Sequence, residues 1–146
     1  MRKKLAVLGA VIGIAASAVL VAAPAQAGTI PRNGGNPGCG LQICLSYNSD
    51  AAGGWWSSDA DEWQDLSGQT FHQGFGSTAW NGVGQQIKNN AAWVCNGGYL
   101  GVYLYVNSAR YGWGVHDYIE PSASGNLKGP GMVTYNNEAA YSIYSH

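Results

Sequence analysis

Few side chains in this sequence could act as acids, bases or nucleophiles, and they are scattered along the chain. The three histidines, His72, His116 and His146, lie far apart. Asp117 follows His116 directly, but neighbouring residues of a strand point to opposite sides, so the two would not form an acid–base pair there. No serine-hydrolase, zinc-protease, paired-cysteine or phosphate-loop motif occurs. The sequence therefore predicts a protein that acts by binding and is not an enzyme.

Three cysteines are the remaining reactive groups. Cys39 and Cys44 enclose four residues, so a disulfide between them closes at a low cost in chain entropy. Export from the cell would permit such a bond. On this interpretation Cys95 is left over, either as a small buried hydrophobic residue or as a thiol for an intermolecular bond.

The amino-terminal segment has the pattern of a secretory signal peptide. Basic residues at positions 2–4 precede an apolar run over residues 5–23, and small residues at 25 and 27 suit a signal peptidase. We therefore expect residues 1–27 to be removed by cleavage after Ala27. A retained membrane anchor is the alternative, and it is disfavoured because no basic cluster follows the apolar run. The mature protein is expected to be extracellular, with no membrane contact.

The composition of the remaining sequence restricts its partners. Its length suits one domain, which we expect to be a monomer. Four basic residues remain against eight acidic ones, which argues against a nucleic-acid partner. Charged residues make up 10% of the chain, whereas it contains six Trp and nine Tyr. Aromatic burial, not surface ion pairs, is therefore expected to stabilise the fold.

The patterning predicts one all-β domain. Residues 28–38 are rich in Gly, Pro and Asn and are expected to form a flexible lead-in, followed by a folded domain over residues 39–146. Apart from one helical turn near residues 62–66, no segment has helical apolar periodicity. Strands are predicted over residues 42–47, 91–95, 101–106, 115–119, 132–135 and 140–144.

Two of these strands carry further information. The sequence Asn-Gly-Gly at 96–98 predicts a tight hairpin between strands 91–95 and 101–106. Strand 101–106 is apolar on both faces, so we expect it to be central in its sheet and covered on both sides. Short strands separated by turn signals are typical of a sandwich or barrel.

The sequence also contains a partial internal repeat. LSYNSDAAGGWW from Leu45 aligns with LYVNSARYGWGV from Leu104, and IKNNAAWV from Ile87 aligns with TYNNEAAYS from Thr134. A repeat of this size indicates two similar units packed together. In each half an aromatic residue precedes a glycine by seven positions. The pairs are Tyr47 with Gly54 and Tyr105 with Gly112. A tyrosine ring can fold over a hairpin glycine, which has no side chain to obstruct it.

These features together resemble the Greek-key repeat of the βγ-crystallin family. The resemblance implies two Greek-key repeats that form one two-sheet sandwich. The opening CGLQICLSY at Cys39 is similar to the start of peptidase inhibitor family I36, secreted actinobacterial proteins whose founding member is a metalloproteinase inhibitor. This resemblance implies a Cys39–Cys44 disulfide and a secreted peptidase inhibitor. The second cysteine pair of the founding member is absent, so its inhibitory loop cannot be transferred to this chain.

The resemblance also implies candidate calcium ligands, because βγ-crystallin repeats often bind calcium through paired Asn or Asp residues followed by hydroxyl residues. Asn89 with Asn90 and Asn136 with Asn137 match the opening of that element, but the hydroxyl residues are missing. Calcium prefers several oxygen ligands, usually including carboxylates. The interpretation we favour is that these asparagines hold turns through backbone hydrogen bonds.

Two kinds of extracellular partner remain possible. A protease could be bound by a rigid loop, for which the connection over residues 120–131 is one candidate. Its glycines argue against a rigid loop, and an ordinary connection is the interpretation we favour there. A glycan or cell-wall polymer could stack on exposed rings of Trp55, Trp56, Trp63 and Trp80. The alternative for most of these tryptophans is a place in the core, because the mature sequence has few aliphatic residues.

Overall fold

The structure is a computed structural model in which residues 27–34, 38–59, 62–74 and 78–146 are described. These residues form nine strands and one 3-10 helix, η1, with the bounds β1 (Thr29–Ile30), β2 (Ile43–Asn48), β3 (Ala52–Ser58), β4 (Trp63–Asp65), β5 (Trp93–Asn96), β6 (Val102–Tyr105), η1 (Ala109–Tyr111), β7 (His116–Ile119), β8 (Ala123–Asn126) and β9 (Ala140–Ser142). The prediction of an all-β chain is confirmed. The described part contains no helix that is long and apolar enough to cross a lipid bilayer. The predicted signal peptide, except for Ala27, lies outside the described residues.

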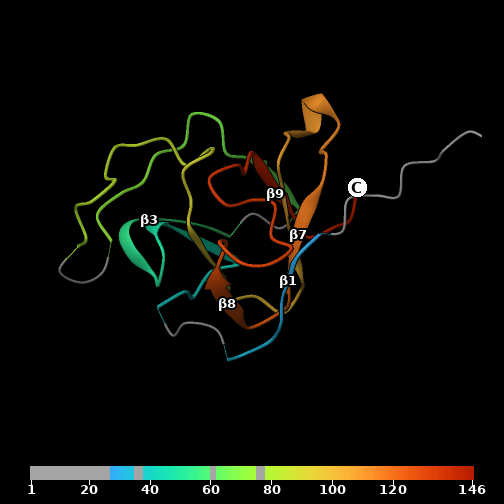
Figure 1. Cartoon of the computed structure of the whole chain (residues 1–146), viewed down its shortest axis with the longest axis horizontal. Coiled ribbons are helices and arrows are strands. Elements are labelled where there is room, and N and C mark those ends of the chain that lie inside the picture. Colours follow the sequence, from blue (N-terminus) through green and yellow to red (C-terminus); the bar gives the residue numbers. More distant parts are fainter. Residues whose placement is uncertain (1–26, 35–37, 60–61, 75–77) are drawn as a thin grey trace, which may run out of the picture.

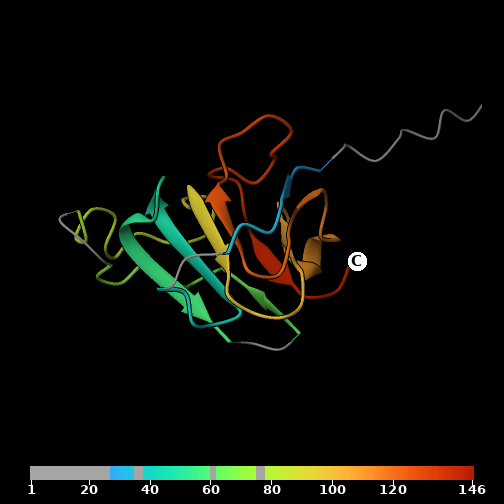
Figure 2. The same cartoon turned by 90° about the horizontal axis from the view of Figure 1, so that it is seen from below.

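The strands form two sheets, and each sheet contains strands from both halves of the sequence. One sheet has the order β3-β2-β5-β8, and the other has the order β1-β7-β6-β9-β4. Paired strands are antiparallel except for β1 and β7, which are parallel. Figure 2 shows β3, β2, β5 and β8 side by side, and Figure 1 shows β1 beside β7.

The two sheets have equivalent strand orders once the repeated sequences are matched. Leu45 of β2 corresponds to Leu104 of β6, and Val94 of β5 corresponds to Tyr141 of β9. On this matching, the order β3-β2-β5-β8 is equivalent to β7-β6-β9-β4. Each half therefore gives three of these strands to one sheet and its fourth to the other. The exchanged strands are β4, which pairs with β9, and β8, which pairs with β5.

Side chains of both sheets meet in one buried apolar cluster. The strand β2 contributes Ile43 and Leu45, and β6 contributes Val102 and Leu104. These pairs are two residues apart because alternate side chains of a strand point to the same face. The opposite face of the first sheet is covered by a second buried cluster, which contains Cys39, Cys44, Trp55, Trp93 and Cys95. Both faces of β2 are thus buried over residues 43–46, where three of the four residues are apolar.

The predicted lead-in is wrong for its first residues, because Thr29 and Ile30 form β1. They pair in parallel with Tyr118 and Ile119 of β7. Ile30 is only 7% exposed and belongs to the main core cluster. A single buried isoleucine among Gly, Pro and Asn residues leaves no periodic pattern from which a strand could be predicted.

The predicted hairpin between strands 91–95 and 101–106 is also wrong. Its first strand, β5, pairs with β2 and β8, whereas β6 pairs with β7 and β9. The connection over residues 97–101 therefore crosses from one sheet to the other. The position of β6 as a central strand is confirmed, since it lies between β7 and β9.

Three other expectations about local structure need correction. Residues 132–135 do not form a strand, because the backbone N–H groups of Val133 and Thr134 donate to the carboxylate of Asp117. The connection over residues 120–131 contains β8, which pairs with β5 at the end of the four-stranded sheet. The helical turn expected near residues 62–66 is instead β4, which pairs with β9 along Trp63–Asp65.

The expected contacts between tyrosine rings and glycines differ from those in the structure. The ring of Tyr47 lies against Gly82, where a Cβ atom would collide with it. The atoms nearest to a Cβ on Gly54 belong to Phe71, Gly82 and Val83 instead. A Cβ on Gly112 would meet no atom of the described residues within 4 Å, so the ring of Tyr105 does not lie over it. Gly112 ends η1 with a left-handed φ of 78°.

Candidate functional site

The connection between β5 and β6 presents the most exposed aromatic side chain among the described residues. Tyr99 is 98% exposed, and the neighbouring Leu100 is 54% exposed. Both are large apolar side chains that ordinarily favour burial. We call residues 97–101 the crossover loop. Its exposed pair is a feature that a binding partner can bury.

The crossover loop is held from inside by the side chain of Asn96, which is fully buried. The Nδ2 atom donates to the carbonyl oxygen of Leu100 at 2.7 Å, and its Oδ1 atom accepts from the N–H of Gly98 at 3.0 Å. The same Nδ2 atom lies 3.1 Å from the carbonyl oxygen of Ile119 and 3.2 Å from that of Glu120. One amide thus fixes the loop to the end of β7.

A second amide supports the loop from its outer side. Gln42 donates through Nε2 to Asn96 Oδ1 at 3.1 Å and to the carbonyl oxygen of Leu100 at 3.2 Å. Gly97 packs so closely on the carbonyls of Cys39 and Leu41 that a side chain would collide with them. The backbone around Tyr99 is therefore preorganised, which lowers the entropy lost on binding.

The cysteines lie next to this support. Cys39 and Cys44 form a disulfide with a Cα–Cα separation of 5.9 Å, as the sequence predicted. Cys95 lies outside that bond, is buried, and faces Cys44 across the β2–β5 pair. The Sγ atom of Cys39 also contacts the carbonyl oxygen of Cys95 at 3.5 Å. The disulfide thus anchors residues 39–44 beneath the start of the crossover loop.

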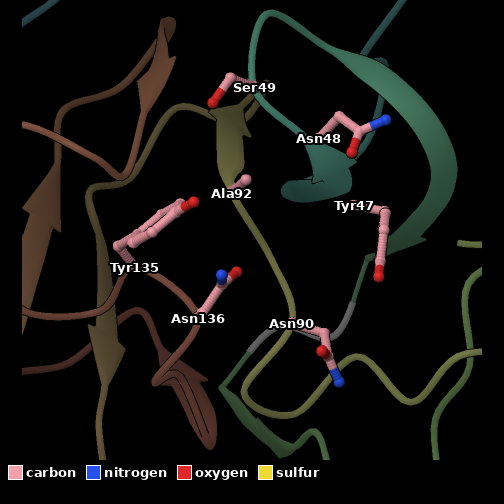
Figure 3. A pocket seen from close by; sticks show the side chains of 7 residues that line it. All are labelled: Tyr47, Asn48, Ser49, Asn90, Ala92, Tyr135 and Asn136. Carbon is pink, nitrogen blue, oxygen red and sulfur yellow. The ribbon is translucent and has the colours of Figure 1, made fainter.

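A separate pocket of about 230 Å³ lies where the two halves meet. Its walls are Tyr47, Asn48, Ser49, Asn90, Ala92, Tyr135 and Asn136. Figure 3 shows Tyr47 and Asn48 of the first half opposite Tyr135 and Asn136 of the second. The described lining is polar and contains no carboxylate, so the pocket suits a small neutral group better than a cation.

The four asparagines of the predicted calcium site are brought together beside this pocket. Asn89 and Asn136, which are equivalent in the repeat, both have left-handed φ values, 65° and 47°. The N–H of Asn89 donates to the carbonyl oxygen of Glu138 at 2.9 Å, and the N–H of Asn136 donates to that of Ala91 at 3.0 Å. The two turns therefore hold each other through equivalent hydrogen bonds.

A buried carboxylate joins the same two turns. The Glu138 side chain is fully buried and accepts from the N–H groups of Asn90 at 2.9 Å, Ala91 at 2.7 Å and Asn137 at 3.0 Å. Burial raises the pKa of Glu138 to about 7, although the backbone N–H donors oppose this change. This residue was not identifiable from the sequence, because a lone glutamate beside alanines is typical of an exposed position.

The contacts of the asparagine side chains support a role in the turns. Asn90 donates through Nδ2 to the carbonyl oxygen of Gln86 at 3.0 Å, and Asn137 donates to that of Val133 at 3.3 Å. Within the described residues, no group of three or more His, Cys, Asp or Glu side chains is placed to hold a metal ion. Asn89, Asn90, Asn136 and Asn137 stay candidate calcium ligands, and the role in the turns stays the interpretation we favour.

The tryptophans named as possible sugar platforms divide into two groups. Trp55 and Trp56 are buried on opposite faces of β3, in the two core clusters. Trp63 and Trp80 are 46% and 69% exposed. The alternative that placed most of these rings in the core is therefore correct for the adjacent pair only.

Trp63 belongs to a larger set of rings on the outer side of the five-stranded sheet. It meets Trp113 at a centroid distance of 5.6 Å, and Trp113 stacks on His146 at 4.2 Å with nearly parallel planes. Tyr105 contacts Trp113 at 4.9 Å. The set, which we call the aromatic face, consists of Trp63, Tyr103, Tyr105, Trp113, His116, Tyr118 and His146.

The histidines do not form a catalytic arrangement with an acid among the described residues. His116 packs between the rings of Tyr103 and Tyr105, whereas Asp117 is fully buried on the other side of β7. This separation agrees with the alternation expected along a strand. The ring of His146 lies on the same aromatic face, and the backbone N–H of His146 donates to the hydroxyl of Tyr105 at 2.9 Å. His72 is exposed on the β4–β5 connection.

Comparison of this chain with family models, with curated proteins and with solved structures finds no match.

Proposed function

We propose that this chain is a secreted peptidase inhibitor that binds its target protease through the crossover loop. The observation that carries the proposal is the nearly complete exposure of Tyr99 on a backbone fixed by the buried Asn96 side chain. An inhibitor of this kind needs no catalytic group. It occupies the protease cleft with a loop that is already in its bound shape.

The chemistry of the loop indicates what kind of protease it would fit. Tyr99 and Leu100 would enter adjacent pockets that accept a bulky aromatic and an aliphatic side chain. The loop carries no charged side chain over residues 97–101, so the cleft it fits is largely apolar. A secreted metalloprotease that prefers bulky apolar residues is the target we propose, in keeping with the resemblance to family I36.

We also propose that the fold is a pair of Greek-key repeats of the βγ-crystallin type. The equivalent strand orders β3-β2-β5-β8 and β7-β6-β9-β4 support this proposal. The exchange of β4 and β8 between the sheets and the reciprocal hydrogen bonds of Asn89 and Asn136 support it further. Residues 1–27 would serve as the signal peptide, which places the mature protein outside the cell.

The test is an inhibition assay with the exported protein. It is incubated at increasing molar ratio with a panel of secreted metalloproteases and serine proteases. We expect at least one protease to lose activity stoichiometrically, with slow cleavage mapped to the Tyr99–Leu100 bond. The Tyr99→Ala variant should weaken inhibition at least tenfold, whereas Tyr111→Ala, at an exposed tyrosine on η1, should leave it unchanged. Full protease activity at an excess of inhibitor, or equal losses in the two variants, would refute the proposal.

The aromatic face supports a second candidate function, binding of a neutral glycan or cell-wall polymer. Trp63 is half exposed and lies against Trp113, and such rings stack well on sugar faces. Sedimentation with insoluble glycans such as chitin, cellulose and peptidoglycan tests this function. The Trp63→Ala variant should lose binding, whereas Trp80→Ala, at an exposed ring on the β4–β5 connection, should retain it. Equal retention of both variants would exclude the aromatic face as the binding surface.

A further inference from the structure

Asp117 of β7 is a fully buried carboxylate whose described partners are all neutral. Its Oδ1 atom accepts from the backbone N–H of Gly28 at 2.9 Å. Its Oδ2 atom accepts from the N–H of Val133 at 3.0 Å and from the N–H and hydroxyl of Thr134. A buried negative charge is expensive without a positive partner, even when it is well hydrogen-bonded.

Gly28 is held tightly against this carboxylate. It is buried, and its carbonyl oxygen accepts from the N–H of Tyr118 at 2.9 Å. A Cβ atom at this position would collide with the Sδ atom of Met132 and approach Asp117 Oδ1 to 3.0 Å. A side chain at this position would therefore require Met132 to move, whereas glycine fits and places its backbone nitrogen on the carboxylate.

Hydrogen bonds of residues 30–33 also limit the movement of Gly28. The N–H of Glu120 donates to the carbonyl oxygen of Ile30 at 3.0 Å, and the N–H of Arg32 donates to Glu120 Oε2 at 2.8 Å. The side chain of Asn33 exchanges hydrogen bonds with the backbone of Ser124 at 2.6 and 3.0 Å. Residues 28–33 are thus bound along β7 and the start of β8, and Gly28 has little freedom to move away from Asp117.

We propose that cleavage after Ala27 makes Gly28 the first residue of the mature chain, and that its new α-ammonium group forms a buried ion pair with Asp117. Hydrolysis of the Ala27–Gly28 peptide bond consumes one water molecule and leaves a carboxyl group on Ala27 and an amino group on Gly28. The amino group takes up a proton at neutral pH. The nitrogen that donates one neutral hydrogen bond in the uncleaved chain becomes a cation at the same place.

This ion pair would make processing a step in the maturation of the fold. The uncleaved chain buries Asp117 without a cation among the described residues, whereas the cleaved chain supplies one 2.9 Å away. The mature protein should therefore be more stable than a chain that keeps even one additional residue. The inference rests on the proposed export of the protein and is independent of its proposed inhibitory activity.

The first test measures the position and reactivity of the amino terminus. The full chain is expressed in a secreting host, and the exported protein is identified by its intact mass. It is then acetylated with a limiting amount of an N-hydroxysuccinimide ester at pH 7, folded or unfolded in urea. An ordinary α-amino group reacts faster than lysine at this pH because its pKa is lower. We expect the Gly28 amine to react at least tenfold more slowly in the folded protein, while the exposed Lys128 reacts at a similar rate in both states.

The second test separates an ion pair from simple burial. Chains that begin at Gly28 or at Ala27 are compared by thermal unfolding, each with Asp117 retained or changed by Asp117→Asn. With Asp117 retained, the additional residue should lower Tm by about 5 °C. In the Asp117→Asn background that difference should vanish or reverse, because the α-ammonium of Gly28 then has no anion beside it. If Asp117→Asn does not fold, the acetylation result decides. Export of a chain that begins at another residue, or equal amine reactivity in the folded and unfolded protein, would overturn the proposal and leave protease inhibition untouched.

Discussion

The carboxylate of Glu138 accepts a hydrogen bond of 2.7 Å from the backbone N–H of Ala91, the residue that occupies the equivalent position in the other half of the chain. The repeat is therefore not symmetric at its centre. One half supplies a buried acid, and the other supplies a small residue with an N–H group for it. The acid joins the two Asn-Asn turns and makes their contact sensitive to pH.

The first prediction concerns that sensitivity. Burial raises the pKa of Glu138 from 4.5 to about 7, so between these values the folded state binds more protons than the unfolded state. The stabilisation from Glu138 is complete below about pH 4.5 and is lost as the pH rises through 7. The free energy of unfolding should fall by about 3 kcal/mol over this interval, measured by urea unfolding at a series of pH values.

Substitution at this position provides the control for that prediction. Glu138→Gln should remove the slope between pH 5 and 7, because the side chain no longer titrates. Glu62→Gln, at an exposed residue, should keep it. A slope that survives in Glu138→Gln would assign the pH dependence to another group.

The second prediction concerns the support of the crossover loop. Asn96→Ala removes the donor to three carbonyl oxygens and the acceptor for Gly98, so buried polar groups lose their partners. We expect the free energy of unfolding to fall by about 3 kcal/mol, with faster proteolysis at the Tyr99–Leu100 bond. Tyr99→Ala should change stability by less than about 0.5 kcal/mol, since that side chain is exposed. Similar stability losses in both variants would contradict the role given to Asn96.

The third prediction compares two glycines with left-handed backbones. Gly82→Ala places a methyl group against the ring of Tyr47 at a φ of 85°, and it should cost more than about 2 kcal/mol. Gly112→Ala has a similar φ of 78° and open space, so it should cost about 1 kcal/mol. Thermal unfolding measures both. If the ring contact is the cause, Tyr47→Ala should reduce the cost of Gly82→Ala in the double variant.

The fourth prediction concerns calcium. The asparagine amides already donate to backbone carbonyls, and the carboxylate of Glu138 already accepts three N–H groups. We therefore expect Tm to stay unchanged on addition of millimolar calcium after treatment with a chelator. A rise in Tm that is lost in Asn136→Ala would establish the calcium site instead.

The strands were predictable where side-chain burial alternates along the sequence. Ile43 and Leu45 mark one buried face of β2, and the predicted range 42–47 differs from the observed strand by one residue at each end. The central position of β6 followed from apolar residues on both of its faces. These features depend on residues close together in sequence, where periodicity carries the information.

The pairing of the strands was harder to predict from the sequence, because paired strands are far apart along the chain. The Asn-Gly-Gly sequence that begins at the last residue of β5 is a local turn signal, but the side chain of Asn96 donates to the carbonyl oxygens of Ile119 and Glu120. The strand β8 has the sequence ASGN, in which only Ala123 is buried. Antiparallel pairing with the backbone of β5 holds this strand in the sheet, and backbone pairing produces no pattern of apolar residues in the sequence.

Most of the candidate site could not be predicted from the sequence either. Its geometry depends on Asn96 and Gln42, which are 54 residues apart and look like ordinary polar residues. One signal was present, a Tyr-Leu pair between glycines in the sequence GGYLG. The structure leaves Tyr99 almost fully exposed, and the proposed role of this pair in binding rests on that exposure.

The exchange of β4 and β8 between the sheets determines what a cut in the crossover loop would do. Scission of the Tyr99–Leu100 bond would leave one piece with β1 to β5 and another with β6 to β9. Three ladders, β1 with β7, β4 with β9 and β5 with β8, span the two pieces. The fragments would stay interlocked, and the severed ends would remain beside each other. If the proposed inhibition is correct, a protease that cuts this loop would release neither fragment, and the nicked protein would stay in its cleft.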